Sequence, residues 1–148
     1  MSENNQNTVY QRIAVAVDGS EHASRALEHA VSLVQSLKTP ATLTLLHVNP
    51  TMMVSEPPFG VDIDQRLDEE GHELTESYRS YLDPTGVQYN IRYHNGDPAT
   101  VICDLAAEEK ADLIIMGTRG MNTMSELFLG SVSHKVIQHA KCPVLTVK

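Results

Sequence analysis

From residue 12 to its end, the sequence alternates between short apolar runs and longer segments whose apolar residues have helical spacing. The five runs cover residues 12–17, 42–48, 87–93, 113–116 and 143–148. Between them, apolar residues recur at intervals of three and four, which is the pattern of an amphipathic helix. Strict strand–helix alternation predicts a single α/β domain, an open five-stranded parallel sheet with helices on both faces.

Two of the runs predict where their strands lie in the sheet. Arg12–Val17 is a continuous apolar run rich in Ile and Val, as expected for a central strand that is buried on both faces. In the third run, Val87, Tyr89, Ile91 and Tyr93 alternate with polar residues. That alternation predicts one exposed face and a position near the edge of the sheet.

Local signals also mark where helices begin and where regular structure is interrupted. Ser20 is a favourable N-cap, and Asp97 followed by Pro98 is a second helix start. A further amphipathic segment runs from 63 to 82. Residues 49–61 are rich in proline and fit no regular element, so we expect a surface loop there.

Composition limits the class of protein and its partners. A chain of 148 residues is predicted to form one domain, and its net charge of −8 argues against nucleic acid or an anionic membrane as the main partner. No apolar run reaches the roughly 18 residues of a spanning helix. Residues 1–8 are polar and lack the features of a signal peptide, so we expect a disordered arm before a domain at 9–148, in a cytoplasmic protein.

The stretch from 112 to 133 carries the strongest functional signal. Gly117 ends the apolar run, Gly120 follows, and Gly130-Ser131 opens a helical segment, which gives the spacing Gly-x2-Gly-x9-Gly-Ser. Glycines let a backbone approach a ligand closely, and the first N–H groups of a helix favour an anion. A strand, a glycine-punctuated loop and a helix start together predict a phosphate-binding loop.

This spacing resembles that of the ATP-binding branch of the universal stress protein family. The resemblance extends from the opening Arg-Ile-Ala-Val-Ala-Val-Asp-Gly-Ser to the closing Cys-Pro-Val-Leu-Thr-Val-Lys. It implies a Rossmann-like sheet of the adenine nucleotide alpha-hydrolase type, with strand order 3-2-1-4-5. Ligands of such sheets lie beyond the strand ends where the winding reverses. Asp18 and Gly117 are therefore expected to meet in one crevice.

The resemblance also implies which residues bind ATP. Val48 stands where the family's backbone contacts adenine, Ala16 stands where some members carry proline, and Met116 would line the same pocket. The phosphate and ribose loop corresponds to Gly117, Gly120, Gly130, Ser131, Val132 and Ser133. The last two residues would offer N–H and hydroxyl donors.

Two polar residues, Asp18 and Arg119, have alternative interpretations, and a third, His47, has one. Asp18 could accept from a ribose hydroxyl, help to hold a phosphate-bound Mg²⁺ ion, or simply form an Asp-Gly-Ser turn. Arg119 lies inside the loop, where it either neutralises phosphate or is solvated. His47 lies in an apolar run and is predicted to be a core histidine whose hydrogen bonds are satisfied.

Signatures of catalysis are missing from the sequence. It has neither the Walker spacing Gly-x4-Gly-Lys-Ser/Thr nor Gly-x-Ser-x-Gly, and the loop has no obvious residue to orient an attacking water. We therefore predict a nucleotide-dependent stress-response module that binds ATP and is not an enzyme. The alternatives are a slow ATPase or phosphotransferase, and a nucleotide-independent interaction scaffold, against which the intact glycine spacing argues.

The resemblance implies a homodimer as well. In similar proteins the last strand, here 143–148, pairs across a two-fold axis. An apolar edge strand also needs cover, because its unpaired backbone groups invite association. A further protein partner is expected for such a module, but the sequence does not identify it.

Overall fold

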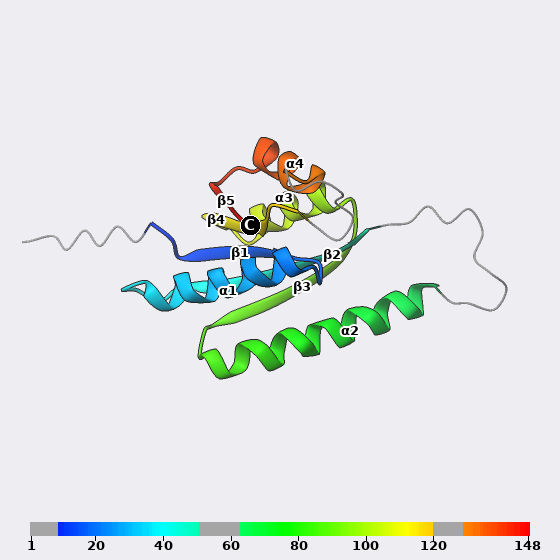
Figure 1. Ribbon diagram of the computed structural model, residues 1–148, viewed down its shortest axis with the longest axis horizontal. Helices are drawn as coiled ribbons and strands as arrows, with labels where there is room; N and C mark the ends of the chain where they lie inside the picture. Colours follow the sequence, from blue (N-terminus) through cyan, green and yellow to red (C-terminus); the bar gives the residue numbers. More distant parts are fainter. Residues whose placement is uncertain (1–8, 51–62, 120–128) are drawn as a thin grey trace, which may run out of the picture.

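The computed structural model describes residues 9–50, 63–119 and 129–148, which form a five-stranded parallel sheet with helices on both faces (Figure 1). The strands are β1 (Arg12–Val17), β2 (Thr42–Pro50), β3 (Tyr89–Gly96), β4 (Leu113–Gly117) and β5 (Val144–Val147). The helices are α1 (Glu21–Ser36), α2 (Ile63–Leu82), α3 (Pro98–Glu108) and α4 (Ser131–His139), with a short 3-10 helix at Asp83–Thr85. The strand order β3-β2-β1-β4-β5 confirms the predicted fold.

The two faces of the sheet are covered by different pairs of helices. On one side, Ile13, Val15 and Val17 of β1 pack in a cluster with α1 and the end of α2. On the other side, Ala14 and Ala16 pack in a second cluster with α3 and α4. Successive side chains of a strand point to opposite faces, so β1 is buried on both sides, as its continuous apolar run predicted.

The edges of the sheet also agree with the patterns of the sequence. β3 lies at one edge, where the alternating third run was expected, and β5 lies at the other. Ser20 accepts a hydrogen bond from the Ala23 amide at 3.2 Å, and Asp97 accepts one from the Thr100 amide at 3.1 Å, so both predicted N-caps are confirmed. Within the described ranges, none of the helices is long and apolar enough to cross a membrane.

Two strands end later than predicted. β2 continues to Pro50 instead of stopping at Val48, and β3 covers Tyr89–Gly96 instead of 87–93. The added residues pair with each other, as Asn49 with Asn95 and Pro50 with Gly96. Apolar periodicity reports burial, whereas these polar ends are held by backbone pairing between neighbours. The rest of the expected loop, residues 51–61, lies outside the described residues.

A glycine brings α2 close to β3. Gly71 is buried in the middle of α2, and a Cβ added there would lie 2.6 Å from Cζ of Tyr93. The Tyr93 ring is in turn stacked on His47, with ring centroids 5.2 Å apart and planes 8° apart. Helix, phenol ring and imidazole ring therefore form one tightly packed layer beside the end of β2.

We predict that Gly71→Ala destabilises the protein by about 1 kcal/mol, as an overpacking cost of roughly 1–3 kcal/mol exceeds the helix-propensity gain of about 1 kcal/mol. Urea denaturation measures the change. In a Tyr93→Leu background the ring is gone, and the same substitution should be neutral or stabilising. Equal effects in the two backgrounds would contradict this explanation of Gly71.

Candidate functional site

A cleft of about 450 Å³ opens where the parallel strands end. β1 pairs with β2 on one side and with β4 on the other, so the winding of the sheet reverses between β1 and β4. Sheets of this kind bind ligands beyond the strand ends at the point of reversal. The cleft therefore lies where the topology favours a ligand site.

The predicted site residues that the structure describes all line this cleft. They come from the ends of β1, β2 and β4, from the loop after β4 and from the start of α4: Ala16, Asp18, Val48, Met116, Gly117, Arg119, Gly130, Ser131, Val132 and Ser133. Gly120 lies outside the described residues. Segments that are far apart in the sequence thus form one continuous wall.

The start of α4 differs from the starts of α1 and α3. Its N-cap is Gly130, which has no side chain to accept from the first amides of the helix. In α1 and α3, by contrast, the N-cap side chain accepts from such an amide. The first N–H groups of a helix have no internal partner and carry partial positive charge. The cleft wall at Ser131–Ser133 is therefore a set of backbone donors suited to an anion.

Hydrogen bonds fix the loop after β4 against this helix start. The Gly130 amide donates to the Thr118 carbonyl at 2.7 Å. The buried Ser133 hydroxyl donates to the carbonyls of Thr118, at 2.9 Å, and Gly130, at 3.0 Å. The Ser133 hydroxyl thus stabilises the loop and is not the ligand donor that the resemblance implied. The backbone N–H of Ser133 remains as a donor toward the cleft.

The two described glycines of the motif lie in tight contact with other parts of the protein. A Cβ at Gly117 would lie 2.8 Å from Cβ and 2.9 Å from the carbonyl carbon of His22 in α1. A Cβ at Gly130 would lie 3.1 Å from the Thr118 carbonyl oxygen and 3.3 Å from Cα of Arg119. From the sequence, these glycines were expected to let a ligand approach the backbone closely. The structure gives a second reason for glycine at both positions, which holds without a ligand.

Asp18 begins the turn between β1 and α1. Its Oδ1 accepts from the Ser20 amide at 2.9 Å, and Gly19 between them has a φ of 81°, which glycine tolerates best. Asp18 is half-buried and lines the cleft. The turn interpretation is therefore correct, and it occupies only one of the two carboxylate oxygens.

The opposite part of the cleft is apolar. Ala16, Val48 and Met116 are buried at the ends of adjacent strands and pack with α3 through Ile102. Pro98, at the start of α3, lines the same part. This wall is suited to an apolar group, while Asp18 and the start of α4 supply polar groups elsewhere in the cleft.

Sequence reasoning missed the part of the cleft formed on the α1 and α2 side. His47, Asn49, Pro50, Glu70 and Leu74 also line it. The prediction that the hydrogen bonds of His47 are satisfied is wrong for Nδ1, which is buried and has no partner among the residues that the structure describes. Burial lowers the pKa of His47, and the Asp18 charge opposes this shift. No sequence signal joins α2 to β2, because their contact is purely tertiary.

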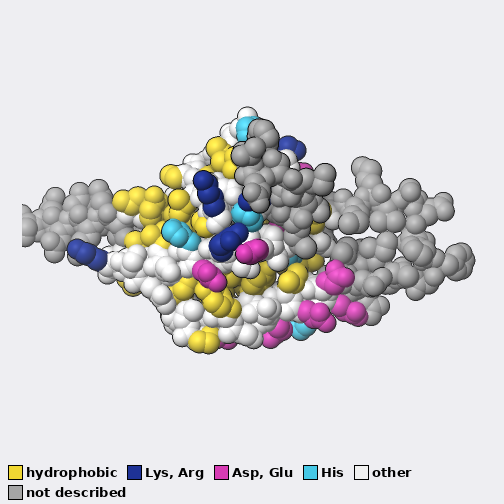
Figure 2. Space-filling model, in the orientation of Figure 1, with side chains coloured by type: hydrophobic (Ala, Val, Ile, Leu, Met, Phe, Trp, Pro, Cys, Tyr) yellow, Lys and Arg dark blue, Asp and Glu magenta, His cyan; other side chains and the backbone are white. Residues whose placement is uncertain are grey.

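Charge is distributed unevenly around the cleft. Figure 2 shows Asp and Glu side chains gathered over α2, where the exposed Glu69, Glu70, Glu73 and Glu76 lie. Such a surface repels anions, so an anionic ligand is expected at the α4 end of the cleft. Arg119 lies at that end, in the loop before α4.

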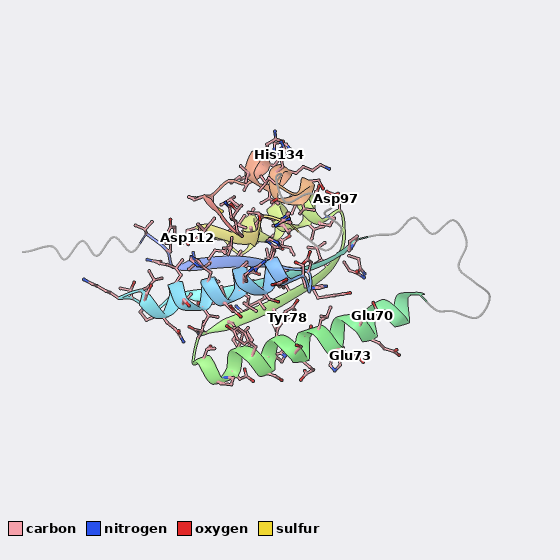
Figure 3. All side chains as sticks on the ribbon, in the orientation of Figure 1. Glu70, Glu73, Tyr78, Asp97, Asp112 and His134 are labelled. Atoms are coloured by element: carbon pink, nitrogen blue, oxygen red, sulfur yellow. The ribbon has the colours of Figure 1, made fainter. Side chains whose placement is uncertain are left out.

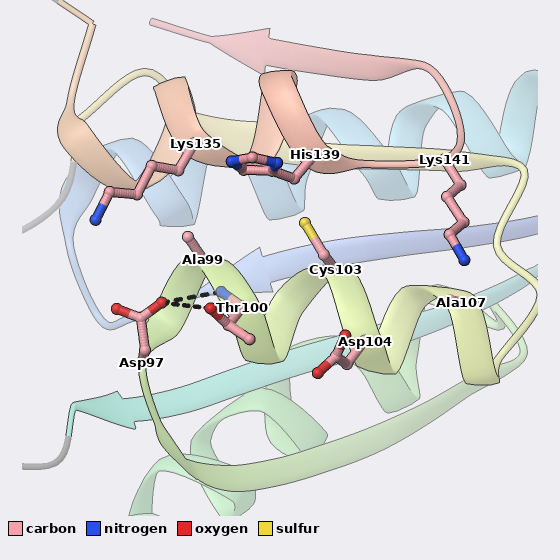
Figure 4. A pocket seen from close by; sticks show the side chains of 9 residues that line it. All are labelled: Asp97, Ala99, Thr100, Cys103, Asp104, Ala107, Lys135, His139 and Lys141. Atoms are coloured by element: carbon pink, nitrogen blue, oxygen red, sulfur yellow. Dashed lines mark hydrogen bonds between the residues drawn. The ribbon is translucent and has the colours of Figure 1, made fainter.

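A second hollow, of about 390 Å³, lies outside this site, between α3 and α4 (Figure 4). Lys135, His139 and Lys141 line one wall, and Asp97 and Asp104 line the other. None of the predicted site residues lies in it. Within the described segments, no three His, Cys, Asp or Glu side chains are placed to hold a metal ion, here or in the cleft.

Comparison with known proteins agrees with this geometry. The model of the universal stress protein family matches residues 9–148. The chain is 35% identical over 150 residues to universal stress protein YxiE of Bacillus subtilis, covering 95% of this chain and all of that protein. The structure of universal stress protein UspA from Lactobacillus plantarum is similar, with a TM-score of 0.82, 27% identity and coverage of 94% of this chain and 98% of that one.

Two similar structures are nucleotide complexes. A universal stress protein in complex with cAMP has a TM-score of 0.71, 25% identity and coverage of 95% of this chain and 99% of that one. The universal stress protein from Archaeoglobus fulgidus in complex with dAMP has a TM-score of 0.66, with the same identity and coverage. From the family match and the identity to its relatives, this chain belongs to the universal stress protein family.

Proposed function

We propose that the protein binds an adenine nucleotide, ATP, in the cleft at the strand ends. The observation that carries the proposal is the start of α4, which has no side-chain cap and lines a cleft that also holds Asp18 and an apolar wall. Complexes of similar proteins with cAMP and dAMP support the ligand class. We also propose that the protein acts in the cytoplasm. Binding of the nucleotide there would change the protein surface that a partner recognises, without hydrolysis of the nucleotide.

Each part of the cleft has a proposed role. The amides of Ser131, Val132 and Ser133 would hold phosphate, and Arg119 would add charge at the same end. Ala16, Val48 and Met116 would contact the base, with Val48 offering its backbone. Gly117 and Gly130 would shape the loop, together with Gly120.

Asp18 would contact the ribose or a nucleotide-bound Mg²⁺ ion. One carboxylate oxygen is held by the Ser20 amide, so the other is available. A single protein carboxylate suits magnesium, which keeps several waters and is otherwise held by phosphate oxygens. Such an ion would neutralise phosphate charge beside Asp18.

The direct test is to denature purified protein and identify the released nucleotide by mass spectrometry, followed by calorimetry with ATP, AMP, cAMP and dATP. We expect ATP to be found and to bind most tightly. Absence of binding by all four would overturn the proposal. Single-turnover assays with ATP test the alternative of a slow ATPase or phosphotransferase, which predicts that bound ATP is converted to ADP.

Asp18→Asn is predicted to weaken ATP binding more in Mg²⁺ than in EDTA, since removal of the charge matters most where the carboxylate helps to hold the ion. The substitution is well matched, because Asn keeps the oxygen that accepts from the Ser20 amide. Calorimetry in the two buffers measures the difference. An equal loss in both would assign Asp18 to the ribose instead.

We further propose a homodimer formed through β5. β5 is an edge strand, and Leu145 on it remains 36% exposed while Ile137 on α4 remains 46% exposed. Large apolar side chains beside an open edge favour pairing with another chain. A two-fold partner is the simplest cover, since most soluble homo-oligomers close in this way.

A further inference from the structure

Two polar atoms behind the cleft have no hydrogen-bond partner in the part of the chain that the structure describes: Nδ1 of His47 and the hydroxyl of Tyr78. Both atoms are buried. Burying a donor or acceptor without a partner costs free energy, so native proteins rarely keep such groups without a reason. Two of them beside one ligand cleft point to a role in that cleft.

Tyr78 of α2 lies beside His47, which lines the cleft. Its ring lies between α2 and the sheet (Figure 3) and packs against the apolar cluster on that face. The rings of Tyr78 and His47 are 6.3 Å apart and tilted by 45°. His47 is in turn stacked on Tyr93, whose ring packs against Gly71 of α2. This packing holds the phenol ring in place, and its hydroxyl proton has no acceptor among the described residues.

The Asp18 charge acts on this hydroxyl. Burial, with a further contribution from the Asp18 charge, raises the pKa of Tyr78 to about 12, and the Gly19 backbone amide opposes this shift. Tyr78 therefore keeps its proton near neutral pH and remains a donor. Asp18 has one oxygen on the Ser20 amide, and the described residues give no hydrogen bond to the other. Among the described residues, the phenol proton of Tyr78 has no acceptor and the second oxygen of Asp18 has no donor.

We propose that Tyr78 is a positioning residue of the nucleotide site: its hydroxyl bonds and orients the Asp18 carboxylate when a ligand enters the cleft, and His47 keeps the phenol ring in place. The unpaired phenol proton destabilises the free protein and finds its acceptor in the bound one. The proposal rests on the proposed nucleotide function, because it concerns how Asp18 meets that ligand. Through Tyr78, α2 would then contribute to ligand binding in the cleft.

Tyr78→Phe tests the proposal because stability and binding should change in opposite directions. Thermal unfolding of the free variant should occur at the wild-type temperature or above, since only an unpaired hydroxyl is lost. Its affinity for ATP should fall by roughly three- to tenfold, the value of one hydrogen bond. If the hydroxyl had a purely structural role, its removal would instead lower the unfolding temperature of the free protein.

A double-mutant cycle then identifies the partner. Asn at position 18 has an NH₂ group in place of the second oxygen and cannot accept from Tyr78. Tyr78→Phe should therefore leave ATP affinity unchanged in the Asp18→Asn background, whereas independent effects would multiply. Tyr81→Phe is the matched control, since Tyr81 lies on the same helix, is 40% exposed, and should change neither property.

The outcomes separate this inference from the function on which it rests. Coupling between the two substitutions, with stability retained, supports it. If wild-type protein binds ATP but Tyr78→Phe binds equally well, destabilises the fold, or acts independently of Asp18, the positioning role is wrong and the nucleotide function stands. If wild-type protein binds no nucleotide, both are overturned.

Discussion

Ser131→Pro is expected to weaken ATP binding by about tenfold to a hundredfold while the fold stays intact. Proline removes the first backbone N–H of α4, and a hydrogen bond to a charged group contributes roughly 1.5–3 kcal/mol. The first position of a helix tolerates proline, because its amide has no partner within the helix. Calorimetry with ATP measures the loss.

The protein contains its own precedent for this substitution. α3 begins with Pro98 after Asp97, whose φ and ψ are −71° and 117°. Gly130, before Ser131, has similar extended values of −62° and 155°, which suit a residue preceding proline. Circular dichroism should therefore be unchanged.

Ser131→Ala is the control for the side chain, since it removes the hydroxyl and keeps the amide. It should retain most of the affinity that Ser131→Pro loses. If the proline variant is folded and binds ATP as the wild type does, the start of α4 does not hold phosphate. The anion would then have to be bound elsewhere in the cleft.

Leu145→Lys is expected to weaken dimerisation by roughly a hundredfold, or to destabilise the protein if the dimer supports the fold. The substitution replaces apolar contact by a charge that loses its water at the interface. The expected cost is about 3 kcal/mol, which corresponds to two orders of magnitude in the dissociation constant. Light scattering over a dilution series measures the change.

Tyr81→Lys is the matched control for charge, because Tyr81 is 40% exposed on α2, far from β5 in the fold, while Leu145 is 36% exposed. It should dimerise as the wild type does. A wild-type protein that stays monomeric at high concentration would refute the dimer. The exposed Leu145 and Ile137 would then need another partner.

Local patterns in the sequence predicted the architecture and much of the cleft. Continuous apolar residues in Arg12–Val17 indicated a strand buried on both faces, and the alternation around Tyr89 and Ile91 indicated an edge strand. Asp18 and Gly117 follow buried strands directly, so a parallel sheet brings them to the same edge. The order of the strands came from the family resemblance, since alternation alone does not decide which strands are neighbours.

Other features depended on contacts between distant segments. The ends of β2 and β3 are set by pairing with each other, as in Asn49 with Asn95, and apolar spacing does not report such backbone bonds. Gly117 is required by His22 in α1, a neighbour that no motif names.

The sequence by itself determined the elements, their alternation and the ends of β1 and β4 at the cleft, because these follow from propensity and spacing along the chain. Only the tertiary structure decided which groups lie behind the site. Tyr78 of α2 approaches Asp18 and His47 because α2 packs over the sheet at Gly71. The physical reason is that burial and hydrogen-bond satisfaction depend on neighbours brought together in space, and a local pattern contains no information about them.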